Sequence, residues 1–300
     1  MGEAGILLMQ LITMFLYVGV GWCLCRAKLV TEANSAALTN LLLYVVIPCV
    51  IVQSFYREAS PETTLELLMS LGLSALAVGL AMAVSFLVFR KRPAANFGSS
   101  FSNAGFMGIP LITAVVGESA VFYIAGFVAL LNILQWTYGQ AILGASREEL
   151  KPLALVRNPL ILAFFVGLLL YFLPITLPPL VENAIGAIAG CNAPVAMVVL
   201  GVLLGNISPR KMFLSGEAWA VSGVRLLLIP LLTALVLMIF PSVPTAMKSA
   251  ILIAAAAPVG SNLALYVQRQ KGDAQAAAGI VCLSTILSIA TMPLIMLLVR

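Results

Sequence analysis

The sequence predicts an all-α integral membrane protein, and three observations support that fold class. Apolar residues make up 62% of the 300 residues, against roughly 45–50% in soluble domains. Charged residues make up only 9%, against about 25% in soluble domains. The mean hydropathy is +1.11. The chain length alone would suggest soluble domains of roughly 150 residues each, but so few charges cannot cover soluble surfaces.

The apolar stretches are long enough to cross a bilayer, because a transmembrane helix needs about 20 mostly apolar residues. Charged or turn-rich breaks separate ten predicted spans, at residues 6–25, 35–55, 66–89, 95–117, 119–144, 157–175, 182–206, 217–240, 248–268 and 275–299. The longest polar stretch is the central loop from Arg147 to Arg157. The pattern therefore leaves no room for a soluble domain.

Basic residues alternate with these predicted spans. Twelve of the 16 fall in every second loop: Arg26, Lys28, Arg90, Lys91, Arg92, Arg147, Lys151, Arg157, Arg210, Lys211, Arg269 and Lys271. The opposite side holds Arg57, Lys248 and Arg300, and Arg225 lies inside the eighth span. The positive-inside rule then predicts that the basic loops face the cytoplasm and that both termini lie outside. We expect a bacterial-type inner (plasma) membrane location.

The composition also excludes most enzyme classes. The chain has no histidine, so it offers no Ser–His or Cys–His nucleophile pair and no ordinary zinc site. Asp273 is the single aspartate, so an aspartyl dyad is excluded as well. The five cysteines all lie in apolar runs, and their odd number and spacing fit packing residues better than disulfides or metal ligands. We therefore predict a non-enzymatic protein without a resident metal or cofactor.

The chain divides into two halves of five predicted spans each. These are residues 1–146, a short cytoplasmic linker at 147–156, and residues 157–300. Because five is odd, the halves enter the membrane from opposite sides, as in transporters built from inverted repeats. An offset of 155 residues aligns Asn103 with Pro258 and Gly105 with Gly260.

Spans 4 and 9 are interrupted near their centres by glycine, proline and asparagine. Span 4 contains Asn103-Ala-Gly-Phe-Met-Gly-Ile-Pro110, and span 9 contains Ala257-Pro-Val-Gly-Ser-Asn262. Unwound backbone at the bilayer midplane is tolerated only when it is buried in protein or lines a cavity. Paired interruptions in two halves are the best sequence indicator of a transporter's binding site. The alternative is that these are kinks without function and asparagines that only bridge helices.

The direction of the two breaks predicts the chemistry of the ligand. We expect helix to restart near Ile109–Pro110 in span 4 and near Ser261–Asn262 in span 9. The N-terminal ends of the two half-helices would then face each other and attract an anion. Asn103 and Asn262 would add amide donors. The predicted site residues are Asn103, Gly105, Pro110, Pro258, Gly260, Ser261 and Asn262.

These motifs resemble the auxin efflux carrier family, which includes plant PIN and PIN-like carriers and bacterial permeases. The span 4 motif is the most specific, and Cys191-Asn-Ala-Pro-Val-Ala-Met197 and Ala257–Asn262 resemble spans 7 and 9 of that family. The resemblance implies the fold of bile-acid-type sodium symporters, with crossing helices 4 and 9. It also implies a dimerising scaffold of spans 1, 2, 6 and 7 and an elevator-like transport domain of spans 3–5 and 8–10. In the family, residues matching Asn103, Pro110, Pro258 and Asn262 form the carboxylate site.

Three smaller signals remain open. Arg225 could attract an anion, or it could snorkel to the interface or cap backbone carbonyls. Gly186-x-x-x-Gly190 and Gly201-x-x-x-Gly205 suit a dimer contact or a crossing within one chain equally well. Asn132 and Gln135 share a helix face, which favours bonding between helices.

The sequence as a whole favours a carrier of small organic anions, with carboxylates as the expected class. One alternative is a sodium-coupled symporter of the bile-acid type. An alternative of another class is a membrane receptor or a channel-like protein. Sodium and protons both remain possible coupling ions, although the eleven carboxylates fall at span ends or in loops. The expected partners are the anion, the lipid bilayer and a second copy of the chain, and no nucleic acid.

Overall fold

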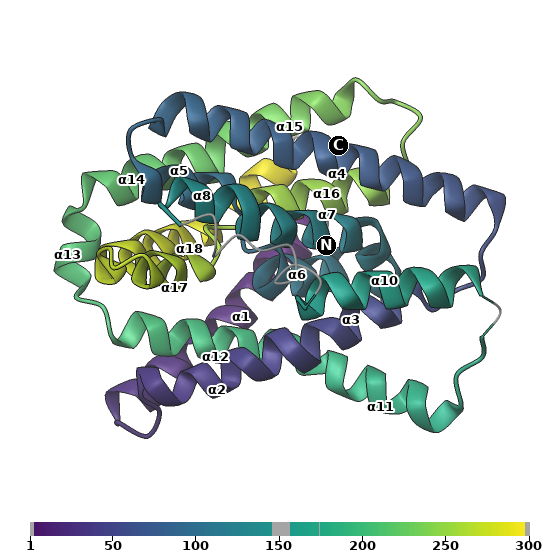
Figure 1. Cartoon of the computed structure of the whole chain (residues 1–300), viewed down its shortest axis with the longest axis horizontal. Helices are drawn as coiled ribbons and strands as arrows, with labels where there is room; N and C mark the ends of the chain where they lie inside the picture. The colour runs from purple at the N-terminus through teal and green to yellow at the C-terminus, as the bar shows by residue number, and fades with distance from the viewer. Residues whose placement is uncertain (1–2, 146–156, 174, 298–300) are drawn as a thin grey trace.

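The computed structural model describes residues 3–145, 157–173 and 175–297, and the regular structure in these ranges is helical (Figure 1). Seven helices within them are long and apolar enough to cross a membrane: Gly5–Arg26, Asn34–Phe55, Pro61–Phe89, Glu118–Ile142, Pro179–Gly205, Gly216–Met238 and Ala274–Met296. The predicted all-α membrane fold class is therefore confirmed. The predicted linker 147–156 and Arg300 lie outside the described residues.

The first half begins with the long helix α1. Its elements are α1 (Glu3–Arg26), α2 (Glu32–Leu41), η1 (Leu42–Val46), α3 (Ile47–Phe55), α4 (Pro61–Phe89), α5 (Pro93–Ser100), η2 (Ala104–Gly108), α6 (Ile109–Val115), η3 (Glu118–Ala120), α7 (Val121–Leu134), η4 (Gln135–Gly139) and α8 (Gln140–Ile142). Of the η elements, η3 is a 3₁₀ turn and the other three are π-helical turns.

The second half repeats the alternation of long and broken helices. Its elements are α10 (Pro159–Phe172), α11 (Pro179–Gly190), α12 (Asn192–Gly205), α13 (Pro209–Leu214), α14 (Gly216–Gly223), the π-helical turn η5 (Val224–Leu228), α15 (Ile229–Met238), α16 (Thr245–Ala256), α17 (Asn262–Arg269) and α18 (Ala274–Met296). Predicted spans 4, 6 and 9 correspond to the shorter apolar helices Ala104–Val115, Pro159–Phe172 and Thr245–Ala256. The count of ten crossings therefore stays a prediction.

Local side-chain caps fix where several of these helices begin. The Ser60 hydroxyl accepts the Thr63 N–H while the Thr63 hydroxyl accepts the Ser60 N–H, so the two residues form a capping box before α4. Asn158 accepts the first N–H groups of α10 in the same way, and Asp273 caps α18. These polar residues satisfy donors that the first turn leaves unpaired.

Three π-helical turns each come directly before an Ile-Pro pair. In each turn the isoleucine N–H donates to the carbonyl five residues earlier: Ile47 to Leu42, Ile109 to Ala104, and Ile229 to Val224. Proline lacks an N–H, and its ring collides with the carbonyl four residues before it in a regular α-helix. A wider turn relieves that collision. The helix therefore continues through proline instead of breaking.

Helices α1 and α12 pack with their backbones in close contact. A side chain at Gly21 would collide with the Val198 carbonyl, and one at Gly201 would collide with the Val18 carbonyl. Gly205 faces Cys25 of α1 in the same way. The Gly201-x-x-x-Gly205 motif therefore forms a crossing within the chain. Gly190 has open space around it, so its motif makes no such contact.

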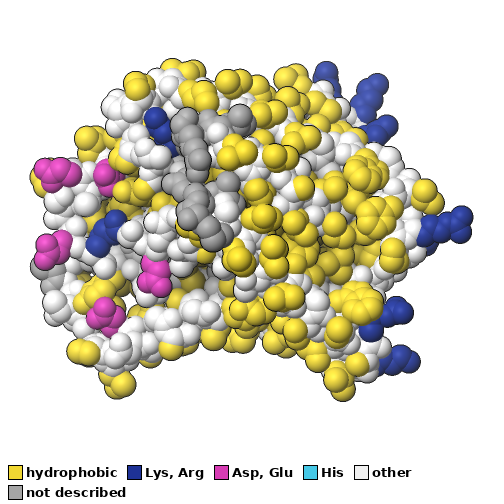
Figure 2. Space-filling view, turned by 180° about the vertical axis from the view of Figure 1, so that it is seen from behind, with side chains coloured by type: hydrophobic (Ala, Val, Ile, Leu, Met, Phe, Trp, Pro, Cys, Tyr) yellow, Lys and Arg dark blue, Asp and Glu magenta, His cyan; other side chains and the backbone are white. Residues whose placement is uncertain are grey.

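Charged side chains gather at opposite ends of the molecule. Figure 2 shows most of the lysine and arginine side chains of this face at one end, the acidic side chains with some basic ones among them toward the other, and an apolar band between. Large apolar side chains are exposed on the helices, including Leu87 on α4 and Leu169 on α10. Such an apolar surface is unstable in water and suits contact with lipid. The protein is thus an integral membrane protein.

Candidate functional site

The two breaks predicted in spans 4 and 9 meet in space. Residues 101–103 separate α5 from η2, and residues 257–261 separate α16 from α17. These two unwound segments, here called the helix crossing, pair antiparallel at Ser102 and Val259. The Asn103 N–H donates to the Pro258 carbonyl at 2.7 Å, and the Gly260 N–H donates to the Phe101 carbonyl at 3.0 Å. Each segment thereby satisfies backbone groups of the other.

The helix restarts differ from expectation in one of the two halves. Helix α17 begins at Asn262, as expected, although the Ser261 side chain makes no cap hydrogen bond. In span 4 the restart expected near Ile109–Pro110 is wrong, because helical structure resumes at Ala104. The Asn103 carbonyl already accepts the N–H groups of Met107 at 3.0 Å and Gly108 at 3.1 Å. The π-helical turn accommodates Pro110, so no break is needed there.

A small cavity of about 30 Å³ lies at the helix crossing, and we call it the crossing cavity. It is lined by Leu43, Ile47, Ser102, Asn103, Gly105, Phe106, Leu131, Asn132, Gln135, Leu160, Gly260, Ser261 and Asn262. Five of the seven predicted site residues therefore come together in one place. Pro258 contributes its carbonyl to the Asn103 N–H, whereas Pro110 lines a different cavity.

The crossing cavity is rich in amide groups, and the described residues that line it include no charged side chain. Asn103 is 5% exposed, and its Nδ2 has no hydrogen-bond partner. The Ser102 hydroxyl is also buried without a partner. The Asn262 Nδ2 donates to the Gln135 Oε1 at 3.2 Å. An unpaired buried donor is costly, so this lining is suited to a ligand that accepts hydrogen bonds.

Asn132 and Gln135 belong to this cavity although the sequence indicated only contacts between helices. Gln135 does bond across to Asn262, while the Asn132 amide donates to the Val128 carbonyl of its own helix. Their spacing of three residues on one face was the available signal, because it turns both side chains in the same direction.

Arg225 lies behind the crossing and lines neither cavity. It is 1% exposed, and its Nη1 donates to the Ser99 carbonyl at 3.0 Å and to the Ser100 carbonyl at 3.4 Å. Its Nη2 donates to the Ala255 carbonyl. These carbonyls end α5 and α16, where the helix dipoles are negative. This arrangement fits the carbonyl-capping role better than direct contact with an anion.

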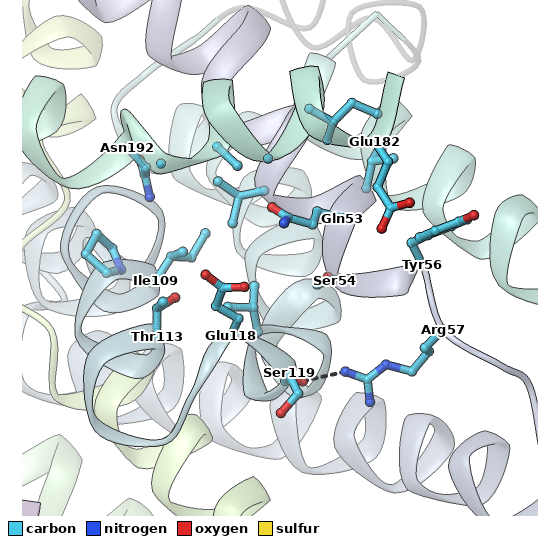
Figure 3. Close-up of a pocket in the computed structure, with 18 of the residues that line it drawn as sticks. Gln53, Ser54, Tyr56, Arg57, Ile109, Thr113, Glu118, Ser119, Glu182 and Asn192 are labelled. Carbon is cyan, nitrogen blue, oxygen red and sulfur yellow. Dashed lines mark hydrogen bonds between the residues drawn. The ribbon is translucent and has the colours of Figure 1, made fainter. Parts of the chain in front are cut away.

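A second cavity of about 640 Å³, here called the large cavity, opens among α3, α6 and α11 (Figure 3). Gln53, Ser54, Thr113 and Asn192 line it, together with Ile109 and Pro110. Three carboxylates also line it, those of Glu58, Glu118 and Glu182. None of these residues except Pro110 is among the predicted site residues, because they come from segments far apart in the sequence.

Arg57 is the basic residue in the lining of the large cavity. Its Nη2 donates to the Ser119 carbonyl at 2.7 Å (Figure 3), and its guanidinium lies 4.2 Å from the centre of the Phe122 ring. Partial burial lowers the pKa of Arg57, but an arginine stays protonated at neutral pH. Among the described residues, the large cavity thus presents the Arg57 cation together with three carboxylates.

Comparison with known proteins finds a family and two relatives that this chain resembles. The sequence profile of a family described as "Membrane transport protein" matches the chain twice, over residues 6–154 and 148–296. The chain is 25% identical over 292 residues to a putative malonate transporter of Rhizobium meliloti (strain 1021), with 91% of this chain and 90% of that protein covered. It is 24% identical over 309 residues to an uncharacterized transporter of Methanothermobacter thermautotrophicus (strain ATCC 29096), with 94% and 95% covered.

Proposed function

Because this chain belongs to the membrane transport protein family, whose profile matches both halves, we propose that it carries small organic anions through the helix crossing. The match confirms the resemblance to the auxin efflux carrier family. Both relatives are named as transporters, which agrees with the prediction of a non-enzymatic protein. Carboxylates are the substrate class that we propose.

The main support is the unpaired amide of Asn103 in the crossing cavity. Its Nδ2 is buried without an acceptor, and the Asn262 amide lies on the other side of the crossing in the same lining. A carboxylate brings oxygens that accept such donors. Binding would therefore replace an unfavourable buried donor by a charge-assisted hydrogen bond.

The electrostatics of the helix crossing also favour an anion. The helix Ala104–Val115 and α17 both start at the crossing, so their positive ends lie there. The opposite, negative ends of α5 and α16 are neutralised by Arg225. No acidic side chain lines the crossing cavity to cancel the positive ends. The balance leaves partial positive charge where the substrate would bind.

The two cavities suggest how the substrate would reach this site. A water needs roughly 10–15 Å³ of such space, so the crossing cavity of about 30 Å³ cannot hold a dicarboxylate as it stands. The large cavity reaches Pro110 and Asn192 and is an entry route from the acidic end. We infer that the predicted transport domain moves against the predicted scaffold, as in an elevator, to open the crossing cavity.

The proposal includes the topology and assembly expected from the sequence. We propose ten spans in two inverted halves, both termini outside, and a homodimer in the inner membrane. Figure 2 supports the sidedness, because most of the basic side chains in that view gather at one end. A phosphatase reporter fused after the last residue tests it. An active reporter is expected, and an inactive one contradicts the orientation.

Transport by purified protein in liposomes tests the function. We expect saturable counterflow of labelled malonate or of another mono- or dicarboxylate in a panel, measured with sodium and pH gradients varied separately. Asn103→Ala and Asn262→Ala should each lower uptake about tenfold or more, as expected for losing a hydrogen bond to a charged group. Asn206→Ala is the matched control, because the Asn206 amide donates to the Val202 carbonyl at the far end of α12.

Three outcomes would contradict the proposal. Unchanged counterflow in both crossing variants would remove the helix crossing as the site. Failure to transport any carboxylate in the panel would remove the substrate class. Single-channel conductance in place of saturable counterflow would favour a channel-like protein. An absolute sodium requirement would instead identify the sodium-coupled alternative within the same site.

A further inference from the structure

Asn192 is a buried amide that links two separate parts of the molecule. It is the first residue of α12, directly after the kink at Cys191 that separates α11 from α12. Its side chain is 3% exposed, and its Nδ2 donates to the Gly105 carbonyl at 3.4 Å. Its Oδ1 is buried and has no hydrogen-bond partner. The amide is therefore only half satisfied in this conformation.

The Gly105 carbonyl is available because of the π-helical turn that contains it. In this turn the Ile109 N–H donates to the Ala104 carbonyl. The next donor in that register would be the N–H of residue 110, which would reach Gly105. Residue 110 is proline and has no N–H. Asn192 thus supplies from a neighbouring helix the donor that the helix itself lacks.

Asn192 and Gly105 also stand between the two cavities. Asn192 lines the large cavity, whereas Gly105 lines the crossing cavity. Figure 3 shows the Asn192 nitrogen directed toward the helix that carries Ile109. The Ile47 side chain lies beside Gly105, 3.6 Å from the position that a Cβ on this glycine would occupy. One side chain, one peptide group and an isoleucine therefore separate the two spaces at this point.

The two partners of this hydrogen bond belong to different predicted domains, Asn192 to the scaffold and Gly105 to the transport domain. Helix α12 is held against α1 by the glycine contacts at Gly21 and Gly201. Gly105 lies in η2, which begins directly after Asn103 of the helix crossing, and the Asn103 N–H donates to the Pro258 carbonyl. A single hydrogen bond of 3.4 Å is weak enough to break and reform during movement. No covalent bond joins Asn192 and Gly105 directly.

We propose that Asn192 is a gating residue that closes the crossing cavity from the large cavity by bonding the Gly105 carbonyl and opens it by releasing that carbonyl. The role rests on the proposed function, since it assumes that substrate moves between these two spaces. On release, the Asn192 amide is free to bond substrate through both its nitrogen and its oxygen. Asn192 thus forms the gate from the predicted scaffold, whereas Asn103 lies in the predicted transport domain.

A thiol-accessibility experiment tests the gate without any substrate. The five native cysteines (Cys23, Cys25, Cys49, Cys191 and Cys282) are replaced by alanine. A single reporter, Ser102→Cys, is then placed in the crossing cavity, where Ser102 is 3% exposed. A second protein carries Thr113→Cys in the large cavity. In separate experiments, a charged methanethiosulfonate reagent is added to the outside or to the inside of liposomes. The side from which it labels Thr113→Cys faster is taken as the reference side.

We expect the Ser102→Cys reporter to react slowly from that side while Asn192 is present. Asn192→Leu, which keeps the branched side-chain shape without the amide, should raise its labelling rate about fivefold, as for the loss of one hydrogen bond. Asn192→Ser, too short to reach Gly105, should do the same if the leucine variant does not fold. The rate at Thr113→Cys should not change, and neither should either rate in Asn206→Leu.

Two results would overturn the gate. One is equal labelling of Ser102→Cys and Thr113→Cys in the protein with Asn192, because then no barrier separates the cavities. The other is an unchanged Ser102→Cys rate in both Asn192 variants. Because labelling needs no substrate, the gate can fail while carboxylate transport holds. A failed carboxylate panel likewise leaves the accessibility result intact.

Discussion

The two cavities of this protein differ in size, in charge and in how well the sequence reveals them. The crossing cavity has a volume of about 30 Å³ and is lined by amides and backbone without a charged side chain. The large cavity has a volume of about 640 Å³ and is lined by three glutamates and Arg57. A small space with fixed amide donors suits selective binding, whereas a wide charged one suits entry and release. This difference supports our proposal that the crossing selects the substrate and the large cavity gives access to it.

The largest effect should come from Arg225, which supports the crossing without lining it. Arg225→Met leaves the carbonyls of Ser99, Ser100 and Ala255 without this donor and two negative helix ends uncompensated. We expect a stability loss of about 3 kcal/mol or more, together with loss of transport. Thermal unfolding in detergent measures the loss. The stability of Arg225→Lys should lie between that of the parent protein and that of Arg225→Met, because lysine keeps the charge but not the planar set of guanidinium donors. A methionine variant that melts like the parent would contradict this role.

A change of charge in each cavity should separate their roles most directly. Asn103→Asp puts a carboxylate in the crossing cavity at nearly constant shape, so anion uptake should fall roughly 100-fold, because opposed like charges cost several kcal/mol. Removing a carboxylate from the large cavity, as in Glu118→Gln, should change uptake less than about threefold. Initial rates in liposomes compare the two. Equal effects of the two variants would mean that the large cavity also selects the substrate.

A small effect, confined to low salt, should come from Arg57, the cation in the described lining of the large cavity. Arg57→Gln should raise KM for an anion entering from that side by about two- to fivefold at low salt, with kcat unchanged. The effect should fade as ionic strength rises, because salt screens exposed charges beyond about 10 Å at 0.1 M. Arg57→Lys should behave nearly like the parent. A fall in kcat that salt does not reduce would instead place Arg57 in the binding site.

The fold was predictable where the signal is local. Long apolar runs predicted the helical membrane fold, and glycine, proline and asparagine marked both breaks of the crossing. Pro110 misled the prediction of the restart, because a π-helical turn lets the helix pass through it. The Ile-Pro pairs at 47–48, 109–110 and 229–230 are the signal that could have indicated such turns.

The site was predictable only in part, for a related reason. Asn103, Gly105, Gly260, Ser261 and Asn262 lie within the breaks or at most two residues beyond them, so the break motifs predicted residues that share one cavity. Arg57, Glu118, Glu182 and Asn192 come together only through tertiary packing of distant helices. No spacing between these residues along the chain predicts that their side chains lie close together. Whole-chain packing has to be known before such residues can be read as a site.

The antiparallel pairing at the helix crossing has a consequence for the two halves as separate polypeptides. The Asn103 N–H and the Phe101 carbonyl are satisfied by Pro258 and Gly260, which belong to the other half. In lipid each unpaired backbone group costs several kcal/mol. Neither half can therefore reach its native shape alone, and co-expressed halves would complement each other like two parts of one broken strand pair. The two halves thus depend on each other, because each supplies a short backbone segment that completes the hydrogen bonds of the other.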